Sequence, residues 1–206
     1  MYLVRYWLAW LPLLAGIHSA SCMATASKPI MVGAAQLAAY FPKLQGKRVA
    51  VVVNHTSYVG KRHLVDILLA QGIDIKKIFV PEHGYRGAQE ANAIIKSEQD
   101  AATGLPILSL HGCVKKPTQA MLADVDVVVF DMQDVGVRCY TYLSTLHHVM
   151  EACAENQRAV IVLDRPNPNG HYIDGPILAS AFRSFVGKHP IPLVYGLTIG
   201  ELARMI

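Results

Sequence analysis

Five short and largely apolar runs recur along this chain, and the first of them is apolar throughout rather than alternating with polar residues. The runs cover residues 49–53, 78–80, 105–110, 125–130 and 159–163. A strand that is apolar on both faces is typical of a parallel sheet with helices packed on both sides. Segments with helical spacing separate the runs. The chain is therefore predicted to form an α/β domain with a Rossmann-like, doubly wound, mostly parallel sheet of about five strands.

The intervening segments supply the predicted helices, which are expected at residues 34–40, 63–71, 117–122, 141–156 and 198–206. Thr198 and Glu201 have the spacing of a capping box, which marks the start of the last helix. Residues 88–103 are polar and are expected to form a helix and an exposed loop. His147 and His148 fall on the longest predicted helix, and we expect both side chains to be solvated.

Polar side chains follow every predicted strand. Because crossovers between parallel strands are right-handed, the carboxyl ends of all five strands meet at one edge of the sheet, where open α/β proteins bind their ligands. The residues expected at this edge are Asn54, His55, Glu82, His83, Arg86, His111, Asp131, Gln133, Asp134, Arg138, Asp164, Arg165 and Asn167. Their clustering predicts a polar ligand site. Taken singly, Glu82 could instead pair with Arg86. Likewise, Arg138 could pair with Asp131 or Asp134.

Several classes of function are disfavoured because the sequence lacks their characteristic motifs. The first strand is followed by Asn-His-Thr-Ser at residues 54–57 rather than by Gly-x-Gly-x-x-Gly, and no Walker A sequence occurs, which disfavours a nucleotide-binding domain. No Gly-x-Ser-x-Gly motif occurs, which disfavours an α/β-hydrolase. The 19 Lys and Arg residues exceed the 15 Asp and Glu residues without forming a basic stripe, so nucleic acid is not an expected partner.

The remaining chemistry is that of carboxylates acting on a polar substrate. Glycoside cleavage needs an acid to protonate the leaving oxygen and usually a second carboxylate as base or nucleophile. Glu82 is the best candidate for the acid, because its turn directly follows an apolar strand that partly withdraws it from water. The possible partners are Asp131, Asp134, Asp164 and Asp174, and the sequence does not choose among them. The predicted catalytic residues are Glu82, Asp131 and Asp134.

The other polar residues of the edge are predicted to bind the substrate by hydrogen bonds, and a tyrosine such as Tyr140 or Tyr142 by stacking on a sugar face. The predicted substrate-binding residues are Asn54, His55, His83, Arg86, Gln133, Arg138, Tyr140, Asp164, Arg165 and Asn167. A metal-dependent hydrolase is an alternative, since metal ligands could converge from four strand ends at His55, His83, His111 and Asp131. The favoured interpretation assigns no metal ligand and no cofactor.

The N-terminus has the pattern of a secretory signal peptide. Arg5 precedes an apolar run at residues 7–17, and an Ala-x-Ala sequence ends at Ala26. The run is too short for a comfortable membrane span. We therefore expect residues 1–26 to be removed, leaving a domain of residues 27–206 in the periplasm or secreted, with no stable membrane span.

Five motifs in a fixed order resemble those of one enzyme family. They are NHTS from residue 54, PEHGYRG from residue 81, DMQDVGVRCYTY from residue 131, DRPNP from residue 164 and GPIL from residue 175. As an ordered set they resemble the exo-β-N-acetylmuramidases of the NamZ type, formerly a domain of unknown function. The resemblance covers about residues 45–206.

The resemblance implies an exo-acting glycosidase that releases N-acetylmuramic acid from the non-reducing ends of peptidoglycan fragments, with Glu82 in catalysis. It also implies that a Rossmann-like N-terminal domain packs on a second domain, which is expected to be absent or truncated in a chain of 206 residues. Arg86, Arg138 or Arg165 would suit the lactyl carboxylate of the sugar. Tyr195 stands where the family tends to have histidine. A sugar-binding module without catalysis is a further alternative.

Overall fold

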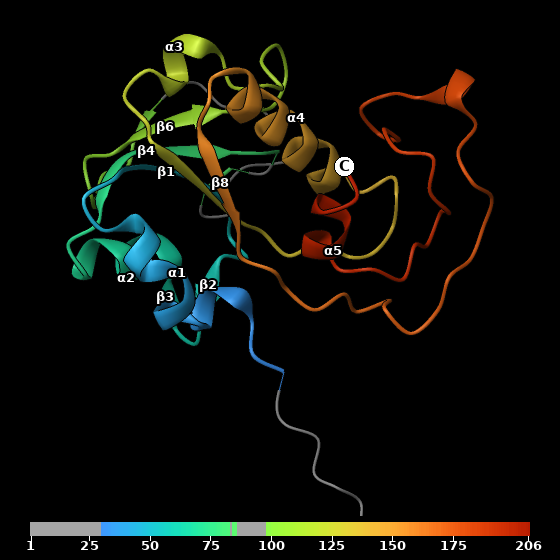
Figure 1. Cartoon of the computed structure of the whole chain (residues 1–206), viewed down its shortest axis with the longest axis horizontal. Helices are drawn as coiled ribbons and strands as arrows, with labels where there is room; N and C mark the ends of the chain where they lie inside the picture. Colours follow the sequence, from blue (N-terminus) through green and yellow to red (C-terminus); the bar gives the residue numbers. More distant parts are fainter. Residues whose placement is uncertain (1–29, 83, 86–97) are drawn as a thin grey trace, which may run out of the picture.

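The computed structural model describes residues 30–82, 84–85 and 98–206. The proposed signal peptide, His83 and Arg86 lie outside these residues, and the predictions made for them stay predictions. The described chain is organised around a six-stranded sheet with the strand order β5-β6-β4-β1-β7-β8 (Figure 1).

The five predicted apolar runs form the five parallel strands of this sheet. They are β1 (Arg48–Val53), β4 (Asp74–Val80), β6 (Pro106–Ser109), β7 (Val127–Asp131) and β8 (Ala159–Val162). The sixth strand, β5 (Glu98–Gln99), is an antiparallel edge strand in a region predicted as helix and loop. The predicted α/β, Rossmann-like fold class is therefore confirmed.

The strand order places a topological switch beside β1. From β1 the chain moves outward to β4 and β6, then returns across the sheet to β7 and β8. Loops at the carboxyl ends of β1 and β7 therefore diverge to opposite sides, which is where doubly wound sheets form a binding crevice. Asn54 follows β1 and Met132 follows β7 at this point.

Helices cover both faces of the sheet. One face carries α1 (Leu37–Leu44) and α2 (Leu64–Ala70), and the other carries α3 (Gln119–Leu122), α4 (Tyr142–Glu155) and α5 (Ile199–Ala203). Strand β1 serves both cores, because alternate side chains point to opposite faces. Its Val49, Val51 and Val53 pack with α1 and α2, whereas Ala50 and Val52 pack toward α4. Burying each valine stabilises the fold by about 1.5–3 kcal/mol.

Smaller elements complete the described chain. They are the 3-10 helices η1 (Gly33–Ala35) and η2 (Ser180–Phe182) and the hairpin strands β2 (Tyr58–Val59) and β3 (Arg62–His63). The predicted capping box at the start of α5 is confirmed: Thr198 accepts from the Glu201 backbone, and Glu201 accepts from the Thr198 backbone. Across the described ranges 30–82, 84–85 and 98–206, none of the helices has the length and apolar character needed to span a membrane.

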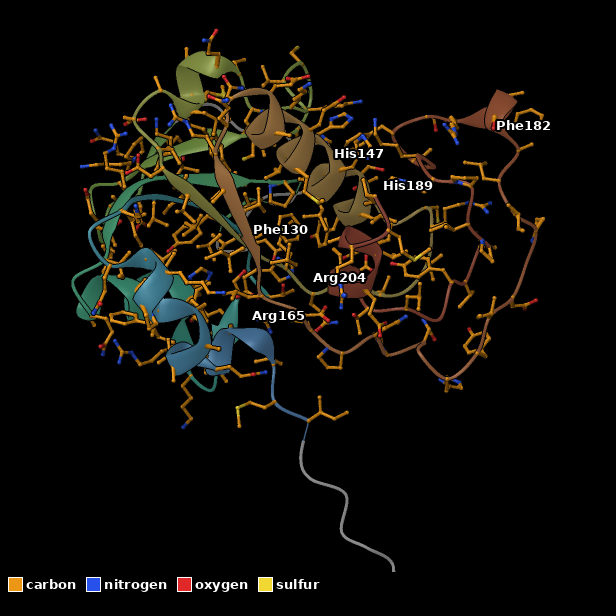
Figure 2. All side chains as sticks on the ribbon, viewed as in Figure 1. Phe130, His147, Arg165, Phe182, His189 and Arg204 are labelled. Carbon is orange, nitrogen blue, oxygen red and sulfur yellow. The ribbon has the colours of Figure 1, made fainter. Side chains whose placement is uncertain are left out.

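The segment between β8 and α5 forms a long loop that extends away from the sheet (Figure 1). Phe130 lies inside the sheet core, whereas Phe182 stands at the far end of this loop with 75% of its surface exposed (Figure 2). Arg138 ties the loop to the body, since its Nη1 donates to the carbonyls of Pro176 and Ile191 at 2.7 and 2.5 Å. Arg138, predicted to bind substrate, thus holds backbone in this structure.

Candidate active site

The carboxyl edge of the sheet carries two groups of polar residues. The Glu82 cluster consists of Asn54, Glu82, His111, Tyr140 and Tyr142, which come from the ends of β1, β4 and β6 and from the start of α4. The Asp131 network consists of Asp131, Gln133, Asp134, Asp164, Arg165 and Asn167, which follow β7 and β8. The two groups have similar residue types but differ in how their polar atoms are used.

Glu82 occupies a half-buried position at the end of β4. Pro81, which lacks a backbone donor, follows the last strand residue, and Glu82 begins the turn. The Glu82 side chain is 24% exposed, and its Oε2 lies 4.0 Å from Nδ1 of His111. A carboxyl group in this position is reachable from solvent and is held beside a second titratable group.

Tyr142 brings a buried hydroxyl to the same place from the first turn of α4. Burial raises its pKa, as do the neighbouring Tyr140 hydroxyl and the charge of Glu82, while the Asn54 amide lowers it. These influences place Tyr142 within electrostatic reach of all three groups. The rings of Tyr140 and Tyr142 meet edge to face, with their centroids 4.6 Å apart.

Two buried donors in the Glu82 cluster lack a hydrogen-bond partner among the described residues. They are Nδ2 of Asn54 and the hydroxyl of Tyr142, and the Asn54 side chain lies close enough to Tyr142 to influence its pKa. Oδ1 of Asn54 is fixed, because it accepts from the backbone N and the hydroxyl of Thr56 at 2.9 and 2.6 Å. Since an unsatisfied buried donor costs about 1–3 kcal/mol, both groups are suited to pair with a ligand.

Asp131 has a different environment, in which its carboxylate is used inside the protein. Arg165 donates to Oδ1 through Nε at 2.6 Å and to Oδ2 through Nη2 at 2.9 Å. Burial raises the pKa of Asp131, whereas Arg165 lowers it. Asp131 is fully buried, so these contacts speak against the predicted catalytic role. The ion-pair partner of Asp131 is therefore Arg165 and not Arg138, which the sequence suggested as a possible partner.

Asp134 is likewise enclosed. Its Oδ2 accepts from the Tyr195 hydroxyl and from the backbone N of Gly136, and only 3% of the residue is exposed. Burial raises the pKa of Asp134, and the Tyr195 hydrogen bond opposes the rise. Asp134 therefore anchors the chain at Tyr195. Its enclosure disfavours the predicted role as a catalytic carboxylate.

The remaining members of the Asp131 network also bind the protein itself. Asp164 accepts from the Gly200 backbone at 2.8 Å and from the Thr198 hydroxyl at 2.6 Å, at the start of α5. Asn167 donates to the Leu197 carbonyl at 2.8 Å. Gln133 donates through Nε2 to the carbonyls of Asp134 and Pro166 at 2.7 and 2.8 Å. These bonds connect the chain after β7 and β8 with α5.

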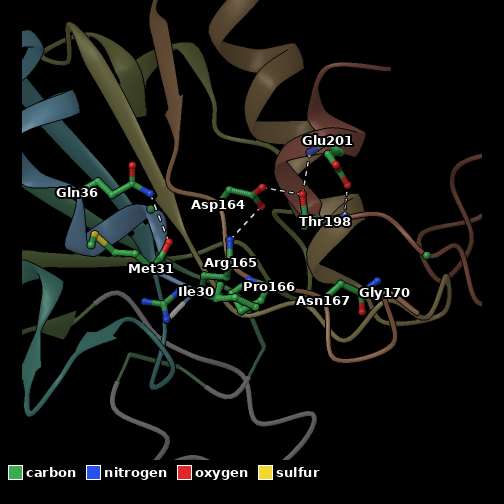
Figure 3. Close-up of a pocket in the computed structure, with 12 residues that line it drawn as sticks. Ile30, Met31, Gln36, Asp164, Arg165, Pro166, Asn167, Gly170, Thr198 and Glu201 are labelled. Carbon is green, nitrogen blue, oxygen red and sulfur yellow. Dashed lines mark hydrogen bonds between the residues drawn. The ribbon is translucent and has the colours of Figure 1, made fainter. Parts of the chain in front are cut away.

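A cavity of about 480 Å³ lies beside the Asp131 network (Figure 3). Asp164, Arg165 and Asn167 line it, together with Gln36 and Glu201. Its size suits a small ligand. Glu82 does not line it, and both oxygens of Asp164 already accept hydrogen bonds. The cavity could therefore bind a ligand, but these two carboxyl groups do not supply it with a general acid.

The predicted residues thus divide between two places. Of the site residues predicted from sequence, Asn54, Glu82 and Tyr140 lie in the Glu82 cluster, and His55 is exposed beside Asn54. His111 and Tyr142 also lie in this cluster. The sequence places His111 at the edge and offers Tyr142 for stacking on a sugar face, but it assigns neither a catalytic role. Among the residues that the structure describes, no group of three or more His, Cys, Asp or Glu is placed to hold a metal ion.

Comparisons with known proteins assign the chain to a family. Residues 49–206 match the family model described as exo-beta-N-acetylmuramidase NamZ, N-terminal. This chain therefore belongs to the NamZ family, and the match corresponds to the N-terminal part of the family fold. The resemblance inferred from the five motifs is confirmed.

One curated relative and two solved structures are similar to the chain. The relative is the peptidoglycan beta-N-acetylmuramidase NamZ of Bacillus subtilis, 47% identical over 169 residues, covering 81% of this chain and 41% of the relative. Two crystal structures of DUF1343 family proteins from Bacteroides fragilis share the fold. One has a TM-score of 0.76 and 49% identity, covering 85% of this chain and 46% of that protein. The other has a TM-score of 0.77 and 44% identity, covering 84% and 44%. The chain spans less than half the length of these relatives.

Proposed function

We propose that this chain is the Rossmann-like part of an exo-acting peptidoglycan β-N-acetylmuramidase and that Glu82 is its general acid. The observation that carries the proposal is the Glu82 cluster. It combines one carboxyl group that is reachable from solvent with two buried donors that lack partners among the described residues. Family membership and the similar B. subtilis enzyme support the substrate class.

Glu82 would act on the bond between N-acetylmuramic acid and the next sugar. Its carboxylic acid gives a proton to the glycosidic oxygen while the bond from that oxygen to the anomeric carbon breaks. Water supplies the hydroxyl group that the anomeric carbon gains. Nδ2 of Asn54 and the Tyr142 hydroxyl would donate to hydroxyl or acetamido oxygens of the sugar, satisfying atoms that are otherwise unpaired.

The lactyl carboxylate of the substrate needs a cation. Arg165 is bound to both oxygens of Asp131, and Arg138 donates to two backbone carbonyls. Arg86, four residues after Glu82 in the sequence, lies outside the described residues and stays the proposed partner of that carboxylate.

The test is release of a chromophore from a β-N-acetylmuramide by the purified chain, compared with the matching N-acetylglucosaminide. Glu82→Gln is expected to lower the rate about 10²- to 10⁴-fold, because the amide cannot give up a proton. Glu98→Gln is the matched control, since Glu98 is an exposed glutamate on the edge strand β5. Circular dichroism and a thermal melt of each variant show whether it is folded.

The outcomes separate the candidate functions. Release from the muramide alone, lost in Glu82→Gln and kept in Glu98→Gln, supports the proposal. Equal rates in Glu82→Gln and the parent chain contradict it. Activity that a chelator removes and a metal ion restores would favour the metal-dependent hydrolase instead.

A non-catalytic sugar-binding module is the second candidate, favoured by the cavity beside the Asp131 network. In that case the folded chain would bind muramyl saccharides without releasing a product. Calorimetric titration with N-acetylmuramic acid, using the parent chain and Gln36→Ala, would detect such binding and locate it in this cavity.

We also propose that residues 1–26 are a signal peptide and that residues 27–206 are the exported domain. The support is the sequence pattern alone. N-terminal sequencing of the protein recovered from periplasmic and culture fractions of an expressing bacterium tests it. A chain beginning at Ser27 is expected, and a chain that keeps Met1 in the cytoplasm would contradict the proposal.

A further inference from the structure

A second cluster of titratable side chains lies away from the sheet edge, between α4 and the loop that follows η2. A cavity of about 330 Å³ is lined there by His147, Arg183, Ser184, Lys188 and His189. Figure 2 shows His147 on α4 and His189 on the neighbouring loop. The expectation that His147 and His148 are simply solvated is wrong, because both are half-buried under this loop.

The loop is held in place by several contacts. Ser184 and Gly187 exchange two backbone hydrogen bonds, at 2.9 and 3.2 Å, which form a tight turn. The Phe185 ring lies 5.7 Å from the His148 ring between centroids, and Nζ of Lys115 lies 4.5 Å from the centroid of Phe185. The cavity therefore has defined walls.

His148 orients the lysine of the cavity. Its Nδ1 lies 3.2 Å from the carbonyl oxygen of Lys115, which accepts only, so this nitrogen carries the proton and donates. The other nitrogen, Nε2, is then an acceptor and receives a hydrogen bond from Lys188 Nζ at 3.0 Å. Two of the three ammonium protons of Lys188 remain for other partners.

Two ring nitrogens of the cluster are buried without a hydrogen-bond partner. They are Nδ1 of His147 and Nε2 of His189, whose rings lie 5.1 Å apart between centroids. Both residues line the cavity. Because buried polar atoms in native proteins nearly always have partners, a ligand in the cavity would account for both.

The charges of the cavity select an anion. Arg183 and Lys188 are positive, and none of the five lining residues is acidic. Burial, followed by the charges of Lys188 and His189, lowers the pKa of His147 to about 4. Glu151 is a neighbouring carboxylate, and Lys116 engages it at 3.2 Å. A metal cation would meet the repulsion of two fixed positive charges, whereas an anion would be attracted.

We propose that this cavity binds a phosphate group, with Arg183 and Lys188 as charge partners and His147 and His189 as hydrogen-bond partners. His147 comes from α4 and the other four lining residues come from the loop after η2, so the polar groups of the cavity belong to two separate elements. A tetrahedral phosphate offers oxygens in several directions, whereas a carboxylate offers two in one plane. This inference does not depend on the proposed glycosidase activity.

The experiment is calorimetric titration of the purified full chain with inorganic phosphate. Arg183→Gln and Lys188→Gln are each expected to weaken binding about ten- to a hundredfold, the effect of losing one hydrogen bond to a charged group. Arg183 is exposed, so its replacement leaves the core intact. Lys43→Gln is the matched control, because it removes one exposed positive charge from α1.

Further arms identify the source of the phosphate. A hexose 6-phosphate represents a soluble phosphomonoester, and phosphatidylglycerol vesicles, compared with phosphatidylcholine vesicles, represent a lipid headgroup. Binding of any of these that Arg183→Gln weakens and Lys43→Gln does not supports the site. The site would be overturned by three results: no binding in any arm, equal binding by all variants, or acetate binding as tightly as phosphate.

Histidine NMR gives an independent readout. The charged and titratable groups that influence the pKa of His147 are Lys188, His189, Glu151 and His148, and Arg183 also lines the cavity. A bound phosphate opposes the charges of Lys188 and His189, so saturation is expected to raise the His147 titration midpoint. An unchanged midpoint in the presence of saturating phosphate would place the phosphate elsewhere and reject the assignment.

Discussion

The Glu82 cluster and the Asp131 network form the two halves of the carboxyl edge. They contain similar residue types, but the contacts of those residues differ. In the Asp131 network, carboxylates and amides bind the protein's own side chains and backbone, although Oδ1 of Asp134 is buried without a hydrogen-bond partner among the described residues. In the Glu82 cluster, the carboxyl group is partly exposed and two buried donors lack partners among the described residues. A carboxylate at a strand end is therefore a better candidate for chemistry when solvent can reach it, as at Glu82, than when it is buried, as at Asp131.

The difference follows from what lies next to each half. The chain after β8 returns across the edge toward α5, so Arg165 and Thr198 reach the carboxylates of Asp131 and Asp164. Beside β4, the described neighbours of Glu82 are His111, which lies at 4.0 Å, and Tyr142, on which its charge acts. Substitutions in the Asp131 network are therefore expected to lower stability, and substitutions in the Glu82 cluster are expected to lower activity.

The largest effect is expected from Asp131→Asn. The substitution leaves Arg165 buried without its carboxylate, and breaking such a pair costs about 3–5 kcal/mol of unfolding free energy. Urea denaturation measures the loss. Glu82→Gln should stay within about 0.5 kcal/mol of the parent chain, since it replaces a half-exposed side chain. Similar losses in both variants would remove the distinction between the two halves.

The next effect compares two buried tyrosines, one from each half. Tyr195→Phe removes a donor to Asp134 and is expected to cost about 1–3 kcal/mol in stability. Tyr142→Phe removes a hydroxyl that has no hydrogen bond in the described structure, so stability should change by less than about 1 kcal/mol. Thermal melts measure both. If Tyr142 contacts the substrate, only Tyr142→Phe should lower turnover of the muramide without lowering stability.

A smaller effect is expected at the start of α5. Asp164→Asn keeps an oxygen for the Gly200 backbone but loses an acceptor for Thr198, which should cost about 1 kcal/mol. Asp174→Asn is the control, because Asp174 is exposed in the same loop and its side chain bonds only to the adjacent Gly175 backbone among the described contacts. Chemical denaturation that shows equal losses for the two variants would contradict the structural role of Asp164.

The smallest effect concerns pH. Burial raises the pKa of Asp134 above its unfolded value of about 3.9, so the native state holds the proton more tightly. The stability that this group contributes is present below the unfolded pKa and is lost as pH rises through the folded value. Compared with Asp134→Asn, the parent chain should therefore lose stability as the pH rises above about 4 and through the raised pKa of Asp134. Parallel pH profiles for the two proteins would show that Asp134 does not titrate in this way.

Local sequence signals predicted most of the fold. The apolar runs at residues 49–53 and 127–130 lie in β1 and β7, because a strand that is buried on both faces carries apolar residues on both. The capping box at Thr198 was readable because its two partners are three residues apart. The strand β5, of two residues, was not predicted, since so short an edge strand depends on its pairing with β6.

The site was predicted in position but not in detail. Strand ends identified the edge, and Glu82 keeps the half-buried position expected of it. The sequence offered Arg138 as the partner of Asp131, because the two lie close in the chain. The structure instead joins Asp131 to Arg165, which is 34 residues away. Likewise, the ring contact between His147 and His189 depends on how the loop after η2 packs on α4, which no local sequence pattern predicts.

The sequence by itself determined the strands, most of the helices, their order and the edge at which polar residues gather, because these depend on apolar periodicity and on the handedness of crossovers. The tertiary structure decided which of these polar groups are buried in contacts within the protein and which stay reachable from solvent. Hydrogen bonds and ion pairs form between residues that meet only after the sheet has assembled. Burial, which sets the strength of those contacts, is likewise a property of the folded chain.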